Sequence, residues 1–472
     1  MRPFSSPLRL PGIALATVAV TLAGCAAPAR RAADAPTTEM PAQWAAAQAQ
    51  GSATPLGQWW GQFNDPLLSA LVQRSLAHNT SLRQAQASLR QARAVSDVQA
   101  AGLLPRVDAS GSAQRSRAGG STGNRFAAGF DASWEPDLFG AERSAVSASQ
   151  ADVAVALASL GDAQVSLAAE VAANYIALRG VQERLAIARS NLASQQETLQ
   201  ISEWRLQAGL TTSLVTEQAR AAVEQTAAQI PALESSLAQT RHALAVLTGQ
   251  PPAALDAALA PARPVPQAPA ELALAIPAQT LRQRADVRAA EQRIVAALAR
   301  VSQADAARYP SLRISGNLGL GAATLGALTN GASVASALLG SISVPLFDGG
   351  AARAQVRVQE AALEQARIGY EAVVLGALQD VEDALVALQG DRERLARLRA
   401  AAEAAANADL LARQRFQSGL IDFPTVLDTQ RTVLAAQDGV AAAQTSLATD
   451  HVRLYKALGG GWVADADSMS RP

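Results

Sequence analysis

The stretch RLQAGL at residues 205–210 recurs 210 residues later as RFQSGL at residues 415–420, and each copy ends a long helical run. The first run extends from Ala141 to Ala208 and the second from Ala351 to Ser418. Because an α-helix rises about 1.5 Å per residue, each run predicts a rod roughly 100 Å long. Two rods of this length predict a duplicated protein that crosses a large distance.

The same order of elements surrounds each long run. The first repeat, residues 58–250, has predicted helices at about 66–101, 141–208 and 212–248, and a β-hairpin at about 103–136. The second repeat, residues 282–460, has predicted helices at about 282–307, 351–418 and 424–458, and a β-hairpin at about 310–346. Pro105 and Pro310 stop the helix before each hairpin. Residues 251–281 form a Pro-rich linker with a short helix near its end, and residues 461–472 form a tail.

Both long runs carry a stripe of mostly apolar residues spaced three and four apart. It includes Leu157, Leu160 and Leu167 in the first run, and Val381 and Leu388 in the second. A sustained seven-residue period predicts coiled-coil packing. Polar residues interrupt the stripe, which favours a wall of helices with a neighbour on either side over a single dry seam. A filamentous coiled coil is the alternative, and it leaves the four predicted strands unexplained.

The four predicted strands are too few to close a barrel. Barrels whose interior side chains fill the space have about eight strands, and membrane-spanning strands need about 9 to 11 residues. An open sheet in a bilayer would leave its backbone edges without hydrogen bonds. If these strands cross a membrane, several chains must therefore share one barrel, and three chains would supply twelve strands. The alternative is a small soluble sheet that caps the helices.

Composition and charge exclude several classes of function. The chain has 40 basic and 40 acidic residues, so it has no positive excess that would favour nucleic acid as a partner. Its apolar fraction is dominated by alanine, which suits closely packed helices. The histidines His78, His242 and His451 fall in separate predicted helices without metal-ligand spacing, and no phosphate loop or nucleophile elbow is present. The sequence therefore predicts neither an enzyme nor a protein with a bound cofactor.

The N-terminus predicts a lipoprotein signal peptide. Arg2 and Arg9 precede a short apolar segment, which ends in the lipobox LAGC at residues 22–25. The pattern resembles that of bacterial lipoproteins, which implies cleavage after residue 24 and an N-acyl, S-diacylglycerol modification of Cys25. Residues 25–57 are rich in Ala, Pro and Thr and predict a flexible tether. An uncleaved anchor is the alternative, but about 15 apolar residues fall short of the roughly 20 needed to span a membrane.

Several motifs together resemble the outer-membrane factor family. They are the lipobox, WW at residues 59–60 with FNDPL at 63–67, the duplicated Pro-strand-strand unit, VPLFDGG at 344–350 and the paired Arg-x-x-x-Gly-Leu turns. The chain is most similar to the lipoprotein branch, the TolC-like outer-membrane channels of tripartite multidrug efflux systems of the RND type. The resemblance covers residues from about 58 to 459.

The resemblance implies a mainly α-helical fold with a small β part, assembled as a homotrimer. Its twelve strands would form one barrel in the outer membrane, and its twelve helices would form an α-barrel in the periplasm. The implied partners are a periplasmic adaptor protein, an inner-membrane RND pump and outer-membrane lipid. The absence of an Asp after Cys25 fits outer-membrane rather than inner-membrane lipoproteins. The chain itself would be a passive conduit for drugs or other small molecules.

The resemblance also assigns roles to the two turns that end the long helices. Adaptor hairpins would dock there, on Ala208, Gly209 and Leu210 in the first repeat and on Ser418, Gly419 and Leu420 in the second. The alternative role of each Gly is only to terminate its helix.

Asp428, with Glu217 as its first-repeat counterpart, matches the acids that ring the closed periplasmic aperture in this family, and Asp422 lies nearby. Such a ring attracts cations. The alternative is that these acids complement a helix dipole. Phe416 takes a gating position where the family can have Tyr.

Trp134 and Phe139 lie at a strand end, where they fit either an aromatic girdle at the membrane surface or packing at the sheet-to-helix transition.

Within the channel class, the second candidate function is the outer-membrane conduit of a type I protein-secretion system. A structural periplasmic coiled-coil lipoprotein is the candidate from a different class.

Overall fold

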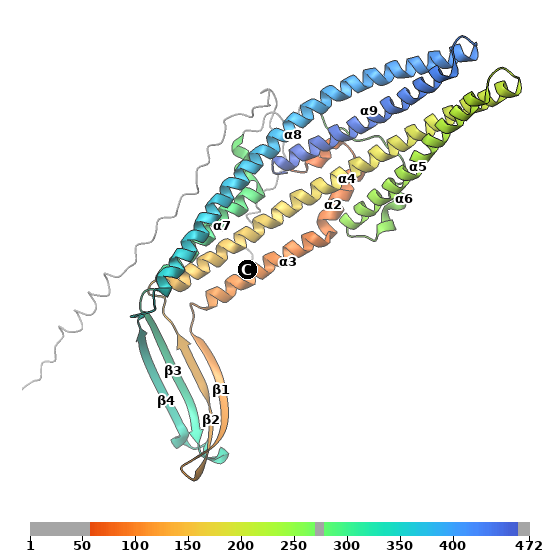
Figure 1. Cartoon of the computed structure of the whole chain (residues 1–472). Coiled ribbons are helices and arrows are strands. Elements are labelled where there is room, and N and C mark those ends of the chain that lie inside the picture. The colour runs from red at the N-terminus through yellow and green to blue at the C-terminus, as the bar shows by residue number, and fades with distance from the viewer. Residues whose placement is uncertain (1–56, 270–277, 461–472) are drawn as a thin grey trace, which may run out of the picture. The chain divides into compact units, whose positions relative to one another are not determined.

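The computed structural model describes residues 57–269 and 278–460. These residues form two compact units: one contains residues 92–153 and 292–368, and the other contains the remaining described residues. The signal peptide, Cys25, most of the tether and the C-terminal tail lie outside the described residues. The family prediction of a mainly helical chain with one small antiparallel sheet is confirmed (Figure 1).

The elements follow one another in two similar series (Figure 1). The first series comprises η1 (Trp59–Phe63), α2 (Pro66–His78), α3 (Thr80–Ala101), β1 (Arg106–Ala118), β2 (Ser121–Trp134), α4 (Ala141–Gln207) and α5 (Ser213–Leu247). The second comprises α7 (Ala285–Ala306), β3 (Ser311–Ala322), β4 (Val334–Ser343), α8 (Ala351–Gln417) and α9 (Phe423–Ala457). Three short helical elements lie between the two series: η2 (Pro252–Leu255), α6 (Asp256–Leu259) and η3 (Ala278–Gln283). Two more, η4 (Leu325–Ala327) and η5 (Gly331–Ser333), lie between β3 and β4.

The helix predicted at residues 66–101 is wrong as a single element, because Asn79 divides it into α2 and α3. The Asn79 Oδ1 atom accepts hydrogen bonds from the backbone N–H groups of Ser81 (2.8 Å) and Leu82 (3.1 Å). Its amide nitrogen donates to the Leu247 carbonyl (2.9 Å). Asn is among the best residues for capping a helix N-terminus. The cap starts a new helix where the apolar period alone suggested continuity.

The first unit is built around a four-stranded antiparallel sheet in the order β1-β2-β3-β4. The register places most of the large apolar residues of the four strands on one face; for example, Phe130 pairs with Leu318, and Ile342 pairs with Leu312. On this face Phe130 is 60% exposed and Leu338 is 82% exposed. A sheet face this apolar and this exposed requires an apolar environment around it.

The opposite face of the sheet carries small and polar residues, among them Ser110, Asp131 and Asn317. The Ser110 hydroxyl donates to Asp131 Oδ2 (2.9 Å). Gly129 pairs with Gly319 across β2 and β3, and a Cβ at Gly129 would lie only 2.7 Å from the Gly319 Cα. Side chains would collide at this pair, so the two glycines permit a close approach that indicates curvature of the sheet toward this face.

The second unit has a continuous apolar core at the junction of α2, α4, α5 and α9. Trp59 is 1% exposed and stacks on Tyr455 with 5.2 Å between ring centroids. Among the described residues, α4 is the one helix long and apolar enough to cross a membrane by length and composition alone. Val171 and Ile176, in the middle of α4, are fully buried in this core.

A buried polar chain ties the start of α2 and the linker to α4. The Tyr175 hydroxyl donates to Asp65 Oδ2 (2.6 Å), and Arg179 Nη2 donates to the same hydroxyl (2.9 Å). Arg179 Nη1 donates to Gln182 Oε1 (2.7 Å) and to the Pro261 carbonyl (2.8 Å). Burial and the hydrogen bond to Asp65 raise the pKa of Tyr175 to about 12, so it remains a neutral donor. Such a network fixes one arrangement of the segments that it joins.

Helices α4 and α9 pack closely at Gly180. A Cβ at this position would lie 3.0 Å from Thr445 Cγ2 and would overlap Thr445 Oγ1. Gly180→Ala is therefore expected to destabilise the protein by about 1–3 kcal/mol. Gly390 of α8 is the matched control, because a Cβ there meets nothing within 4 Å, and G390A should be neutral or stabilising by up to about 1 kcal/mol. Thermal unfolding in detergent, followed by circular dichroism, measures both; unchanged melting of G180A would contradict the close packing.

A pair of carboxyl groups lies between α8 and α9. Asp450 is 2% exposed and its Oδ1 accepts from Arg453 (3.0 Å), whereas its Oδ2 is buried without a donor beside Asp391. Two carboxylates form a hydrogen bond to each other only when one of them holds a proton. Burial, and then the charge of Asp391, raise the pKa of Asp450 to about 6.

This raised pKa predicts a specific pH dependence of stability. The unfolded chain releases the Asp450 proton near its ordinary pKa of about 3.9. Between about pH 4 and 6 the folded state therefore binds more protons, so the contribution of Asp450 to stability falls as the pH rises through this range. Asp450→Asn is expected to remove this contribution, and Asp391→Asn to reduce it. Melting temperatures of the wild type and both variants at pH 4 to 7 measure the effect; parallel curves for wild type and D450N would contradict it.

Candidate functional site

Each long helix ends in the same turn. In the first turn the Leu210 N–H donates to the Arg205 carbonyl (2.7 Å), and Gly209 has φ +71°. In the second the Leu420 N–H donates to the Arg415 carbonyl (2.9 Å), and Gly419 has φ +73°. These hydrogen bonds and the left-handed Gly define a Schellman motif, which satisfies the last carbonyl groups of a helix. The two glycines therefore terminate α4 and α8, as one of the two sequence interpretations proposed.

The same turns also present apolar side chains to their surroundings. Leu210 is 69% exposed and Leu420 is 74% exposed. Ala208, Gly209, Ser418 and Gly419 are exposed as well, and a Cβ on either Gly would meet nothing within 4 Å. The turns thus combine helix termination with open, partly apolar surface, so the two sequence interpretations are compatible. The assignment of these six residues to adaptor docking stays a prediction.

An apolar cluster joins the two turns, and Phe416 lies within it rather than on the surface. Phe416 is 7% exposed and lies 5.7 Å from Phe423, measured between ring centroids. The Arg205 guanidinium lies 4.6 Å from the Phe416 ring centroid, and its Nη1 donates to the Phe416 carbonyl (2.9 Å). A cation over an aromatic ring contributes about 0.5–2 kcal/mol. Phe416 therefore holds the end of α4 to the end of α8.

Arg205 and Phe423 are residues that the sequence prediction missed here. Arg205 and Arg415 are equivalent residues in the RLQAGL and RFQSGL motifs. The repeat therefore gave no sign that Arg205 contacts Phe416 of the second repeat. Phe423 lies just after the second turn, where the first repeat has Ser213. This difference between the copies was the available signal, because only the second repeat places an aromatic residue at this point.

The three predicted aperture acids have different surroundings. Asp422 is the N-cap of α9: its Oδ1 accepts from the Thr425 N–H (3.3 Å) and from the Thr425 hydroxyl. These hydrogen bonds lower the pKa of Asp422. Its equivalent, Thr212, makes no side-chain cap hydrogen bond at the start of α5. For Asp422, the interpretation as a helix-capping residue accounts for its contacts.

Glu217 and Asp428 are both exposed and lie on α5 and α9 close to the turns. Glu217 forms an ion pair with Arg220 (3.2 Å), three residues further along the same helix. Among the residues that the structure describes, no cation lies within 4.0 Å of the Asp428 carboxylate. Asp428 thus has the less compensated charge of the two. Buried neighbours of these acids, Ala219 and Val426, belong to the same apolar cluster, so the two helices pack together where the acids lie.

The strand ends show where the predicted girdle residues lie. The Trp134 indole donates to the Leu103 carbonyl (3.1 Å) and the residue is 38% exposed. Phe139 stacks on Tyr309 with 5.0 Å between ring centroids and an interplanar angle of 13°. For Phe139 the structure favours packing at the sheet-to-helix transition over a position in a membrane girdle.

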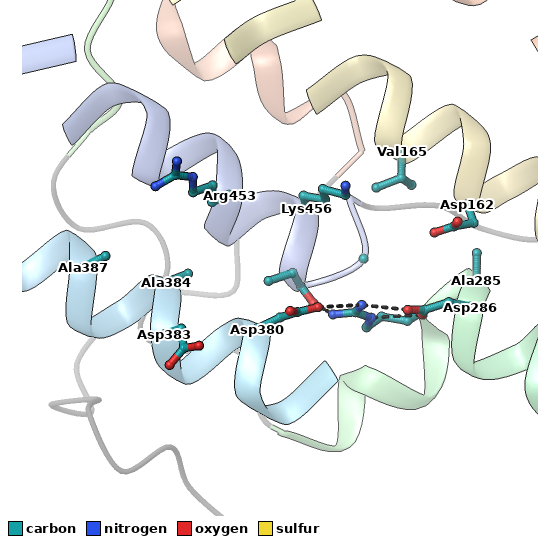
Figure 2. A pocket seen from close by; sticks show the side chains of 13 residues that line it. Asp162, Val165, Ala285, Asp286, Asp380, Asp383, Ala384, Ala387, Arg453 and Lys456 are labelled. Carbon is teal, nitrogen blue, oxygen red and sulfur yellow. Dashed lines mark hydrogen bonds and ion pairs between the residues drawn. The ribbon is translucent and has the colours of Figure 1, made fainter. Parts of the chain in front are cut away.

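A charged cavity of about 440 Å³ lies beside the C-terminal end of α9 (Figure 2). Arg284 spans it, donating to the Ala457 carbonyl (2.6 Å), to both carboxylate oxygens of Asp286 (3.0 and 2.7 Å) and to Asp380 (3.2 Å). Burial disfavours the charged guanidinium, but the pairing with Asp286 and Asp380 outweighs it and raises the pKa of Arg284. Each guanidinium nitrogen is already engaged, so the contacts of Arg284 fasten α7, α8 and the end of α9 together.

Within the described ranges 57–269 and 278–460, no group of three or more His, Cys, Asp or Glu side chains could hold a metal ion. His451 is 4% exposed, and one ring nitrogen contacts the Leu447 carbonyl (2.8 Å). Burial lowers the pKa of His451. Its surroundings are those of a neutral packing residue in the core of α9.

The outer membrane efflux protein family model matches residues 71–250 and 276–460, one match for each half of the duplication. The chain belongs to the outer membrane efflux protein family. Outer membrane protein OprJ of Pseudomonas aeruginosa is 32% identical over 471 residues, covering 96% of both chains. The pyoverdine export outer membrane protein OpmQ of Pseudomonas putida is 34% identical, covering 90% of this chain and 93% of the relative. The solved outer-membrane channel OprN is 36% identical, with a TM-score of 0.81 over 90% of this chain and 99% of that one.

These similarities confirm the predicted family, function and location. The protein is an outer-membrane channel of a tripartite efflux system. Its family consists of channel proteins. The sheet and the long helices have different roles in this channel. The sheet has the exposed apolar face that a membrane requires, and the long helices end in the paired turns.

Removing both exposed acids near the turns tests whether they line the closed aperture. Glu217→Ala with Asp428→Ala is expected to raise the conductance of the closed channel and to weaken its block by divalent cations, because the negative ring is lost. Glu224→Ala, an exposed acid further along α5, is the control. Single-channel recordings in planar bilayers provide the measurement. Unchanged conductance and unchanged cation block in the double variant would assign both acids to the helix surface only.

Proposed function

We propose that three copies of this chain assemble into a passive conduit through the outer membrane and the periplasm. Each copy contributes its four-stranded sheet to one twelve-stranded barrel and its helices to one tunnel. The support for this proposal is that β1 and β4 are the unpaired edges of a sheet with one exposed apolar face. In a bilayer such edges cost several kcal/mol per unsatisfied group, and closure with further copies removes them.

The strand lengths fit this role. The four strands contain 13, 14, 12 and 10 residues, and a tilted strand needs about 9 to 11 residues to cross the bilayer. The small and polar face of the sheet would line the lumen, where water is present. The curvature toward that face at Gly129 and Gly319 supports the same assignment.

The turn regions would connect the channel to its partners. We infer that a periplasmic adaptor docks on Ala208, Gly209, Leu210, Ser418, Gly419 and Leu420, and that an inner-membrane pump of the RND type drives transport. The lipid predicted on Cys25 would anchor each copy in the outer membrane. Asp428 and Glu217 would form the cation-attracting ring of the closed aperture, with the Arg205–Phe416 contact holding each pair of turns together.

The transported compounds would be small molecules, including drugs. Similar channels are named for pyoverdine export and for toluene and antibiotic efflux. Compounds of such different polarity share no single binding chemistry, which favours a conduit whose cargo the pump selects. The chain supplies the path and no energy.

The trimer and the pore are tested together. Native mass spectrometry of the purified protein in detergent should give three copies per particle, and insertion into planar bilayers should give discrete conductance steps. A monomer without conductance would overturn the proposal and leave a structural coiled-coil protein. Deletion of the gene should increase susceptibility to the drugs that the cognate pump exports.

The exposed leucines of the turns provide a separate test of docking. Leu210→Glu with Leu420→Glu is expected to abolish efflux while leaving the trimer intact, because charged groups would have to be buried against the adaptor. Leu210→Met with Leu420→Met keeps the surface apolar and should retain efflux. Drug susceptibility of cells that produce equal amounts of each variant measures the effect. Full activity of the Glu variant would place the docking surface elsewhere.

A further inference from the structure

One contact within the chain joins the two repeats at the boundary between sheet and helices. Phe139 lies between β2 and α4, and it stacks on Tyr309, which lies between α7 and β3. The strands on either side of this contact, β2 and β3, are neighbours in the sheet. The contact therefore lies next to the place where β2, the second strand of the first hairpin, pairs with β3, the first strand of the second hairpin.

The equivalent residues on the outer sides of the sheet lack this contact. Leu346 and Phe347 lie between β4 and α8 and are 94% and 92% exposed, the highest values for large apolar side chains in the described part of the chain. Leu104 lies between α3 and β1, just before Pro105, as Tyr309 lies just before Pro310. It is 66% exposed. The residues at these equivalent positions are thus exposed on one chain.

An open cavity lies beside Leu104. It has a volume of about 590 Å³, and Leu104, Pro105, Trp134 and Glu142 are among its lining residues. The segments before α4 and α8 each contain Pro, a Leu-Phe pair and a final Gly, although Asp137 precedes the Leu-Phe pair in the first and Asp348 follows it in the second. The two segments therefore carry the same aromatic group to the same boundary.

We propose that Phe347 of one copy packs into the cavity beside Leu104 of the next copy, as Phe139 packs on Tyr309 within the chain. This inference rests on the proposed trimer and specifies its interface. β4 of one copy then pairs with β1 of the next, just as β2 pairs with β3. The contact is heterologous, so it joins unlike surfaces and closes a ring when the rotation between copies is one third of a turn.

The repeat also fixes the register between the copies. Trp134 lies seven residues before α4 and pairs with Ile314, four residues after Pro310. Val344 is equivalent to Trp134, because it lies seven residues before α8. Ala109 is equivalent to Ile314, because it lies four residues after Pro105. Pairing Val344 with Ala109 brings Ser341 opposite Ser112 and Ile342 opposite Gly111. This register keeps the apolar faces of both copies on one side; a slip by one residue would bury polar groups against apolar ones.

Cysteine crosslinking tests the register. Ser112→Cys with Ser341→Cys is expected to yield covalent dimers and trimers on non-reducing gels after mild oxidation. Ser110→Cys with Ser341→Cys, displaced by two residues on the same face, is the matched control and should remain largely monomeric. The two Ser341→Cys and Ser112→Cys single variants show whether Cys25 takes part. Crosslinking of the displaced pair instead of the proposed pair would overturn the register.

A second pair tests the aromatic contact itself. Leu104→Cys with Phe347→Cys should be joined between chains by a short bifunctional thiol reagent, whereas Phe139→Cys with Tyr309→Cys should be joined within one chain and migrate as a monomer. Native mass spectrometry of each variant before crosslinking shows whether a trimer is present. A trimer without the Leu104–Phe347 crosslink would overturn this inference and leave the proposed function standing. Absence of a trimer in the wild type would overturn both.

Discussion

A sheet that enters a bilayer must not leave a row of backbone groups without hydrogen bonds, and this constraint governs the rest of the structure. The four-stranded sheet of one chain cannot meet it, because β1 and β4 have free edges. The exposed apolar face requires lipid, whereas the free edges require more strands. Duplication within the chain supplies one internal strand pairing, β2 with β3, and in the proposed assembly association between chains supplies the remaining one. In the proposed assembly, closure of the barrel would also bring the long helices of the three chains together.

The two repeats differ in sequence and in contacts at the turns that end their long helices. Asp422 caps α9, whereas Thr212 makes no side-chain cap for α5. Arg205 of the first turn reaches Phe416 of the second, which Arg415 does not repeat. Each difference gives the two turns different local contacts.

The predictable parts of the fold and site are those with local causes. Gly209 and Gly419 end their helices because only Gly adopts φ > 0 without strain, and this could be predicted from the motif alone. The break at Asn79 could not, because the same Asn inside a continuing apolar period is equally compatible with one helix. The burial of Phe416, Asp450 and Arg179 could not be predicted either, because each depends on a partner far away in the sequence. Phe416 contacts Arg205, 211 residues away, and Arg179 contacts Pro261, 82 residues away. Asp450 lies beside Asp391, 59 residues away.

The amino-acid sequence by itself determined the length of the two long helices, the two hairpins, the duplication and the family, because periodicity, proline and glycine act over a few residues. Only the tertiary structure decided how the four strands align to give the sheet an apolar face. It also decided which residues join the two turns, and which aromatic side chains are exposed. The physical reason is that register and packing depend on contacts between segments far apart in the chain. Phe139 and Phe347 have similar local sequences, and only the fold shows that one is satisfied within the chain and the other is not.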